Sequence, residues 1–150
     1  MAALTTSKKN PQFDDPSPIV KSLSLPMKAN TKALAGGLAA IDSAGNAMPA
    51  TPTAGGTVRV IGVFQEEVDN STGLAGAKRV ATRRGAFSFK NSTAGDAITA
   101  AEVGALVFAV DDQTVAKTDG GAGARKVAGA CLGLDDNGTD VIVEVGVHLG

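Results

Sequence analysis

Two stretches decide the fold class, Val60-Ile61-Gly62-Val63-Phe64-Gln65-Glu66-Glu67-Val68-Asp69-Asn70-Ser71 and Arg83-Arg84-Gly85-Ala86-Phe87-Ser88-Phe89-Lys90-Asn91. Both are rich in β-branched and aromatic residues, which suit the pleated surface of a strand. Turn-forming residues bound each stretch. We therefore predict a strand over 57–64. We also predict one long or bulged strand over 77–89, with Gly85 at a bulge or bend.

The composition describes a chain that can form one packed domain with few reactive groups. Its 150 residues are 43% hydrophobic but only 3% aromatic, with no Trp and no Tyr, so Val, Leu, Ile, Ala and five Phe must form the core. The formal net charge is −1. The whole molecule therefore has no electrostatic attraction to nucleic acid or to anionic membranes. No apolar run approaches the roughly 20 residues that span a bilayer.

Further strand patterns extend through the rest of the chain. Residues 22–27 alternate in polarity, but Pro26 restricts this strand to a sheet edge. Two more pairs are predicted, 106–110 with 113–117 and 126–134 with 141–149, the second joined by a turn at Asn137-Gly138. Thr99 to Glu102 fits a capping box and predicts one helical turn. The sequence therefore predicts an all-β fold, a small β-barrel or sandwich with one short helical turn.

Residues 1–21 differ from the body predicted over 22–150. Pro11, Pro16 and Pro18 interrupt any helix and remove donors that a sheet would need. Two interpretations stay open, an extended N-terminal arm and a tail without function. The apolar residues spaced along the segment are Phe13, Ile19 and Val20.

One basic cluster is present, and it follows the predicted strand over 77–89: Lys78, Arg79, Arg83, Arg84 and Lys90. It could contact nucleic acid, contact an acidic neighbouring subunit, or form a solvated strand face. Binding to single-stranded nucleic acid also needs stacking aromatics, which Phe87 and Phe89 could supply on one strand face. The alternative is that both Phe side chains belong to the core.

Residue types that usually carry catalysis or bind metals are rare. Cys131 lies among apolar residues and is expected to be an unreactive core thiol, and the single histidine, His148, has no nucleophile partner in a recognisable motif. The 135–140 stretch resembles a calcium loop, but its first position is Gly133 and its flanks are strands, so we expect a hairpin turn. Carboxylate pairs such as Asp111-Asp112 are expected to be solvated turn residues. We expect no enzyme activity, no cofactor and no metal.

Several motifs in this order resemble the decoration, or cement, proteins of tailed-bacteriophage heads. They are residues 37–45 with Pro49, residues 60–70, residues 84–87, residues 98–104, residues 110–116, and Ala128-Gly129. The resemblance implies a β-barrel over 22–150 that binds the outside of an assembled capsid, often as a homotrimer, and stabilises it. The implied partner is the phage major capsid protein, with no membrane and no nucleic acid bound, on the virion surface after synthesis in the bacterial cytoplasm.

Candidate contact residues come from the residues themselves, because the sequence of the N-terminal segment is not a signature of this family. Residues 1–21 would be a capsid-binding arm, with contacts at Phe13, Pro16, Ile19 and Val20, and Arg79, Arg83 and Arg84 are possible subunit contacts. The alternative function is a nucleic-acid-binding β-barrel that uses the basic strand from Lys78 to Lys90. A carbohydrate-binding or enzyme-accessory module is disfavoured by the lack of Trp and Tyr.

Overall fold

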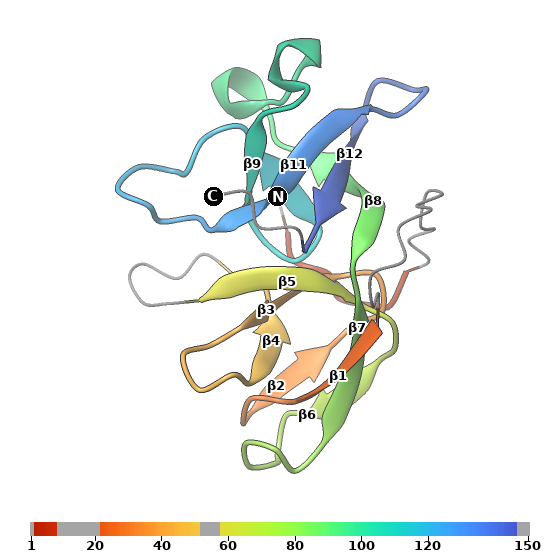
Figure 1. Ribbon diagram of the computed structural model, residues 1–150, viewed down its shortest axis with the longest axis vertical. Coiled ribbons are helices and arrows are strands. Elements are labelled where there is room, and N and C mark those ends of the chain that lie inside the picture. Colours follow the sequence, from red (N-terminus) through yellow and green to blue (C-terminus); the bar gives the residue numbers. More distant parts are fainter. Residues whose placement is uncertain (1, 9–21, 52–57, 147–150) are drawn as a thin grey trace.

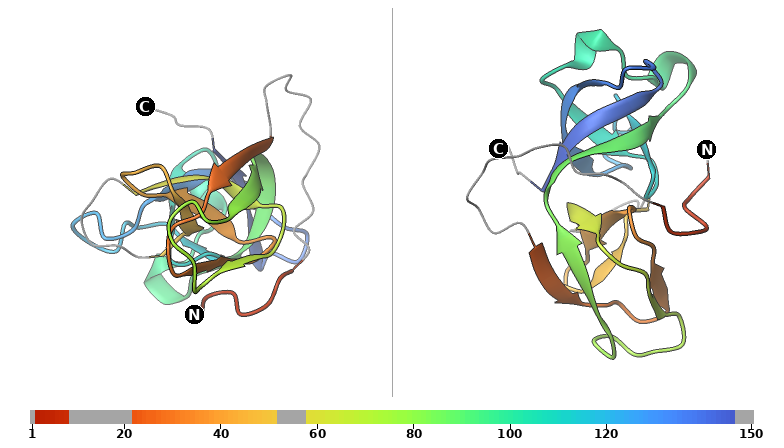
Figure 2. Two further views of the ribbon diagram at one scale, coloured as in Figure 1. Left: turned by 90° about the horizontal axis from the view of Figure 1, so that it is seen from below. Right: turned by 90° about the vertical axis from the view of Figure 1, so that its right-hand side faces the viewer.

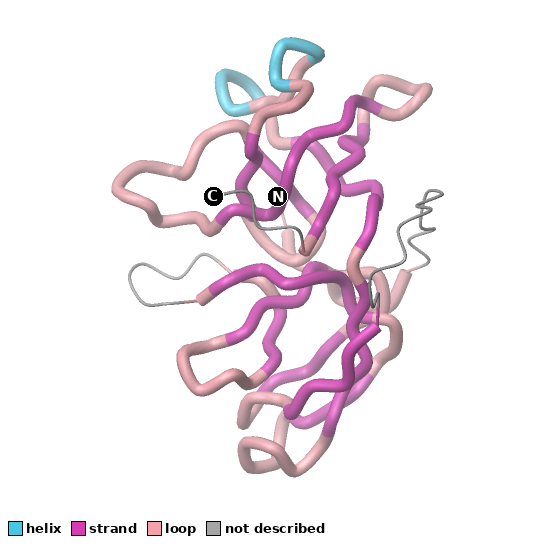
Figure 3. Tube along the Cα trace, viewed as in Figure 1, coloured by secondary structure: helices cyan, strands magenta, loops and turns pink. Residues whose placement is uncertain are grey.

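The computed structural model describes residues 2–8, 22–51 and 58–146, and these residues form an all-β fold, as predicted (Figure 1). The described strands are β1 (Ser22–Pro26), β2 (Thr31–Ala33), β3 (Leu38–Ile41), β4 (Ala47–Pro49), β5 (Arg59–Phe64), β6 (Val68–Asn70), β7 (Arg79–Arg83), β8 (Gly85–Asn91), β9 (Leu106–Ala109), β10 (Thr114–Ala116), β11 (Val127–Leu134) and β12 (Asp140–Val145). Two 3-10 turns, η1 (Ala94–Asp96) and η2 (Ala100–Glu102), lie at the end of the molecule away from β1–β7 (Figure 3). No described helix is long and apolar enough to cross a membrane.

The second half of the chain forms a closed barrel with the strand order β10-β8-β12-β11-β9. Alternate residues of β12 point inward, so Val141, Val143 and Val145 are fully buried while their neighbours are partly exposed. On β8, Phe87 and Phe89 occupy the same face and are also fully buried in this core. The predicted pairs are confirmed, because β9 pairs with β10 and β11 pairs with β12 in antiparallel fashion.

The first half of the chain forms a five-stranded sheet with the order β1-β7-β5-β3-β4. Its two ends meet at one point, where Met27 bridges Ala47 and the Lys28 N–H donates to the Ala47 carbonyl at 2.9 Å. The small β2-β6 sheet lies at the end of this half away from the barrel (Figures 1 and 2). β1 is an edge strand, as its proline predicted.

Strands β3 and β5 form a wall shared by two hydrophobic cores. Along β3, Leu38 and Ala40 belong to the larger core with the barrel residues, whereas Ala39 belongs to the smaller core of the first sheet. Along β5, Val63 faces the larger core and Phe64 the smaller one. Alternation along a strand therefore buries both faces of this wall, and the two sheets form one continuous packed structure.

The prediction of one strand over 77–89 is wrong, although the position of the bend is right. β7 ends at Arg83 in the first sheet, and β8 begins at Gly85 in the barrel. Gly85 has φ of 143°, a conformation that other residues rarely adopt. The glycine therefore transfers the chain from one sheet to the other.

Two features lacked a local sequence signal. β2 and β6 pair with each other but are only three residues long, too short for a clear strand pattern in the sequence. The first 3-10 turn has no side-chain cap, and Asp96 instead accepts bonds from Thr118 and Arg125 of a distant loop. The second turn is the predicted one: its capping box is present, with Glu102 accepting from the Thr99 N–H at 2.6 Å.

Candidate functional site

Residues 2–8 lie across the seam between the barrel and the first sheet, and we call them the N-terminal strap (Figure 2). On the barrel side, the Leu4 N–H donates to Asp112 Oδ1 at 2.7 Å, and the Gln113 amide donates to the Ala2 carbonyl. On the side of the first sheet, the Lys8 N–H donates to the Ala35 carbonyl at 3.0 Å. The strap therefore bonds to both halves of the molecule.

Ser7 makes the strap's side-chain contact with the first sheet. Its hydroxyl accepts from the Ala35 N–H at 3.3 Å and donates to Glu67 Oε2 at 2.7 Å. Glu67 also pairs with Lys32, with Nζ and Oε1 2.9 Å apart. The hydrogen bond from Ser7, followed by the contact with Lys32, lowers the pKa of Glu67. All three side chains are accessible to water, so this contact contributes little by charge alone.

Asp112 joins three segments at the seam. Its side chain accepts from the strap, and its backbone carbonyl accepts from the Leu38 N–H, at the start of β3, at 2.7 Å. Gly37 lies so close that a β-carbon there would sit 3.2 Å from Asp112 Oδ2. Asp112 is only 4% exposed, and burial raises the pKa of its carboxyl group.

The expectation that Asp111 and Asp112 are solvated is wrong. Asp111 is 7% exposed and accepts from the Gln113 N–H at 2.9 Å, so the pair does form a turn, but a buried one. A sequence signal for burial was absent, because the strap that bonds to Asp112 lies more than 100 residues away.

Lys8 is close by. Burial lowers its pKa, Lys90 lowers it further, and Asp140, Asp112 and Asp111 oppose this shift.

Asp112→Asn is expected to unfold no more easily than the native chain near neutral pH. Since burial raises the pKa of Asp112, folding favours its protonated form. This group's contribution to stability is complete below the unfolded-state pKa and is lost as the pH rises through the folded-state pKa. Asparagine keeps an oxygen that can accept from Leu4 without a buried charge. The difference in free energy of unfolding that favours the variant over the native chain should therefore become smaller as the pH falls.

Urea unfolding of both proteins between about pH 3 and about pH 8 measures this difference. Asp136→Asn is the matched control, because Asp136 is an exposed carboxylate in the β11–β12 turn, and its effect should stay within about 0.5 kcal/mol. The prediction is contradicted if the free energy of unfolding of the native chain rises relative to that of Asp112→Asn as the pH increases toward neutral.

The three arginines of the basic cluster each contact a different part of the fold. Arg79 donates to the Ser24 carbonyl at 2.7 Å, Arg83 lies 5.1 Å above the Phe87 ring centroid, and Arg84 donates to the Gly146 carbonyl at 3.4 Å. These contacts hold arginines against β1, the barrel core and the end of β12. Phe87 and Phe89 are core residues, as one interpretation predicted, and their buried rings are not accessible for stacking with bases.

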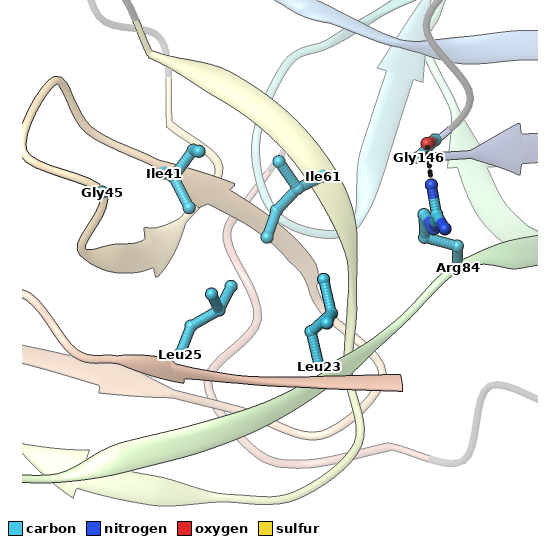
Figure 4. A pocket seen from close by; sticks show the side chains of 7 residues that line it. All are labelled: Leu23, Leu25, Ile41, Gly45, Ile61, Arg84 and Gly146. Atoms are coloured by element: carbon cyan, nitrogen blue, oxygen red, sulfur yellow. Dashed lines mark hydrogen bonds between the residues drawn. The ribbon is translucent and has the colours of Figure 1, made fainter. Parts of the chain in front are cut away.

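An apolar groove lies between β1 on one side and β3 and β5 on the other (Figure 4). Its volume is about 360 Å³. It is lined by Leu23, Leu25, Ile41, Gly45, Ile61, Arg84 and Gly146. Leu23, on the edge strand, is 50% exposed. Sequence reasoning missed the groove because its lining comes from segments far apart in the chain and no single segment carries a signal for it.

The remaining candidate residues have structural environments or lie outside the described residues. Cys131 is fully buried in the larger core, as predicted, and burial raises the pKa of its thiol. Residues 135–140 form the predicted hairpin turn, with Asp135 Oδ1 accepting from the N–H groups of Thr139 and Asp140. His148 and the predicted arm contacts Phe13, Pro16, Ile19 and Val20 lie outside the described residues.

Over residues 2–8, 22–51 and 58–146, no group of three or more His, Cys, Asp or Glu side chains is placed to hold a metal ion. Comparison with models of protein families, with curated proteins and with solved structures finds no match for this chain.

Proposed function

We propose that this protein is a structural component of a bacteriophage virion. It binds the outside of the assembled capsid as a homotrimer and stabilises the shell by bridging subunits of the major capsid protein. Its role is mechanical, with no reaction catalysed. The proposal rests on the sequence resemblance to head decoration proteins and on one structural observation, an available sheet edge beside an apolar groove.

The edge strand β1 carries this argument. Within the described residues, β1 forms a ladder with β7 on one side and has no strand along its other side. An edge of this kind offers backbone donors and acceptors to an extended segment of another protein. Leu23 projects beside that edge into the groove, so a capsid segment that adds to β1 could bury apolar side chains against Leu23, Leu25 and Ile61.

The predicted arm immediately precedes β1, so contacts made by Phe13, Pro16, Ile19 or Val20 would be continuous with this edge. Each such contact is weak alone. Copies that are repeated over a shell and joined into trimers bind through several contacts at once, and multivalency then supplies the strength of attachment. The arginines of the basic cluster remain candidates for contacts between subunits, with Arg79 placed beside β1 through its bond to Ser24.

Binding to undecorated heads tests the proposal. The protein is mixed with heads of the same phage that lack it, and co-sedimentation measures the affinity. We expect saturable binding, and Leu23→Asp should weaken it by about tenfold or more, because it places a charge in an apolar contact. Leu74→Asp is the matched control: Leu74 is 80% exposed in the β6–β7 loop, away from the groove, and the substitution should leave binding unchanged.

Two results would overturn the proposal. One is the absence of any binding to heads. The other is salt-dependent binding to oligonucleotides without binding to heads, which would favour the alternative, a nucleic-acid-binding barrel that uses the basic cluster between Lys78 and Lys90.

A further inference from the structure

We propose that the N-terminal strap is exchangeable between copies of this chain. In an isolated molecule, residues 2–8 bind to a site on their own chain, which we call the seat. Where molecules crowd together, residues 2–8 bind to the same site on a neighbouring molecule. The seat consists of Asp112 and Gln113 on the barrel and Ala35 and Glu67 on the first sheet. This inference concerns contacts between copies and does not depend on a capsid.

The seat recognises the strap through features that any copy presents. Asp112 accepts a backbone N–H, the Gln113 amide donates to a backbone carbonyl, and the Ala35 carbonyl accepts a second backbone N–H. Ser7 adds one side-chain bond to Glu67. The strap of a second copy can make the same set of bonds, so exchange changes no contact and has no intrinsic cost in contact energy.

The strap is held loosely enough to exchange. Ala2, Ala3, Thr5, Thr6 and Ser7 are exposed, and only Leu4 and Lys8 are partly buried. Hydrogen bonds therefore provide most of the free energy that keeps the strap in its seat, and each contributes about 1 kcal/mol net. A segment with little apolar burial opens at a much lower free energy than the core does. The strap can leave its seat without unfolding the sheets beneath it.

The chain between the strap and the body is long enough to reach a neighbour. Residues 9–21 separate Lys8 from Ser22, and a connection of that length can span at most roughly 45 Å. A folded chain of 150 residues has a radius of gyration of about 15 Å, so a seat on a touching molecule lies within reach. An intramolecular seat has an effective concentration on the order of millimolar, so exchange requires a comparable density of neighbours.

Cross-linking between two differently labelled populations tests this inference. One population carries Ser7→Cys and the other Glu67→Cys, two exposed positions whose native side chains are hydrogen-bonded to each other. Ser7→Cys also removes the acceptor of the Ala35 N–H, but the bonds of Ala2, Leu4 and Lys8 remain. The two are mixed over a range of concentrations and treated with a short bis-maleimide. Cys131 is buried in both and should not react. We expect covalent heterodimers whose yield rises as the protein concentration approaches the millimolar range.

The matched control replaces Glu67→Cys with Ser43→Cys, an exposed position in the β3–β4 turn that takes no part in the seat. It should give far fewer heterodimers. Adding Leu4→Pro to the Ser7→Cys chain removes the N–H that Asp112 accepts, and should reduce the Ser7–Glu67 product severalfold. The inference is overturned if heterodimers do not exceed those of the control at any concentration. It is also overturned if Leu4→Pro leaves their yield unchanged. Because no heads are present, neither result bears on the proposed function.

Discussion

Gly129→Ala is expected to unfold the protein under conditions in which the native chain is stable. Gly129 lies on β11 where its register against β9 shifts, and it is paired with Val145 on the neighbouring strand β12. A β-carbon at this position would overlap the Glu144 carbonyl oxygen and lie 3.0 Å from Val143 Cγ1. The obstacle is backbone in the middle of a sheet, which cannot rotate away as a side chain can. We expect a loss of roughly 3 kcal/mol or more.

Thermal and urea unfolding measure this effect, with Gly95→Ala as the control. Gly95 lies in the first 3-10 turn, and a β-carbon there would meet no atom within 4 Å. The control should change stability by no more than about 1 kcal/mol, and in the favourable direction if the turn accepts alanine. Equal stabilities for the two variants would show that β11 and β12 separate more easily than their bonding indicates.

Phe89→Ala is expected to destabilise the larger core by roughly 3–5 kcal/mol, the range for removing a buried aromatic side chain. Phe89 is fully buried on β8, opposite Val141 of β12, and the chain has few large side chains with which to fill the cavity. Since a domain has only about 5–15 kcal/mol of stability, this loss should lower the urea midpoint sharply.

The control for this core variant is Leu74→Ala, because Leu74 is 80% exposed and should change stability by about 0.5 kcal/mol or less. A small effect of Phe89→Ala would contradict the prediction, because it would mean that the surrounding core collapses to fill the cavity.

Features encoded by neighbouring residues could be predicted from the sequence. Thr99 and Glu102 form their capping box through contacts three residues apart, and Gly138 turns the last hairpin with φ of 68°. The edge position of β1 follows from the missing N–H of Pro26, and the burial of Cys131 follows from its apolar neighbours. In each case the deciding interaction lies within a few residues of the signal.

Features decided by distant partners could not be predicted. Gly85 marks a bend in the sequence, but only the packed structure shows that β7 and β8 belong to different sheets. Asp112 resembles a solvated turn residue until the strap is placed against it. The groove could not be predicted for the same reason, because Leu23, Ile41 and Ile61 become neighbours only when β1, β3 and β5 are assembled. Attachment to a capsid stays a prediction of the sequence resemblance.

The wall shared by the two cores has a consequence for synthesis of the chain. Leu38, Ala40 and Val63 are made early, but they are buried against barrel residues that come from positions 85–145. A ribosome that adds about 5–20 residues per second needs roughly 3 to 12 s to supply them. During that interval one face of β3 and β5 has no partner, so the nascent chain carries an apolar surface that attracts chaperones or other nascent chains. Folding of this protein is therefore completed only after β12 has left the ribosome.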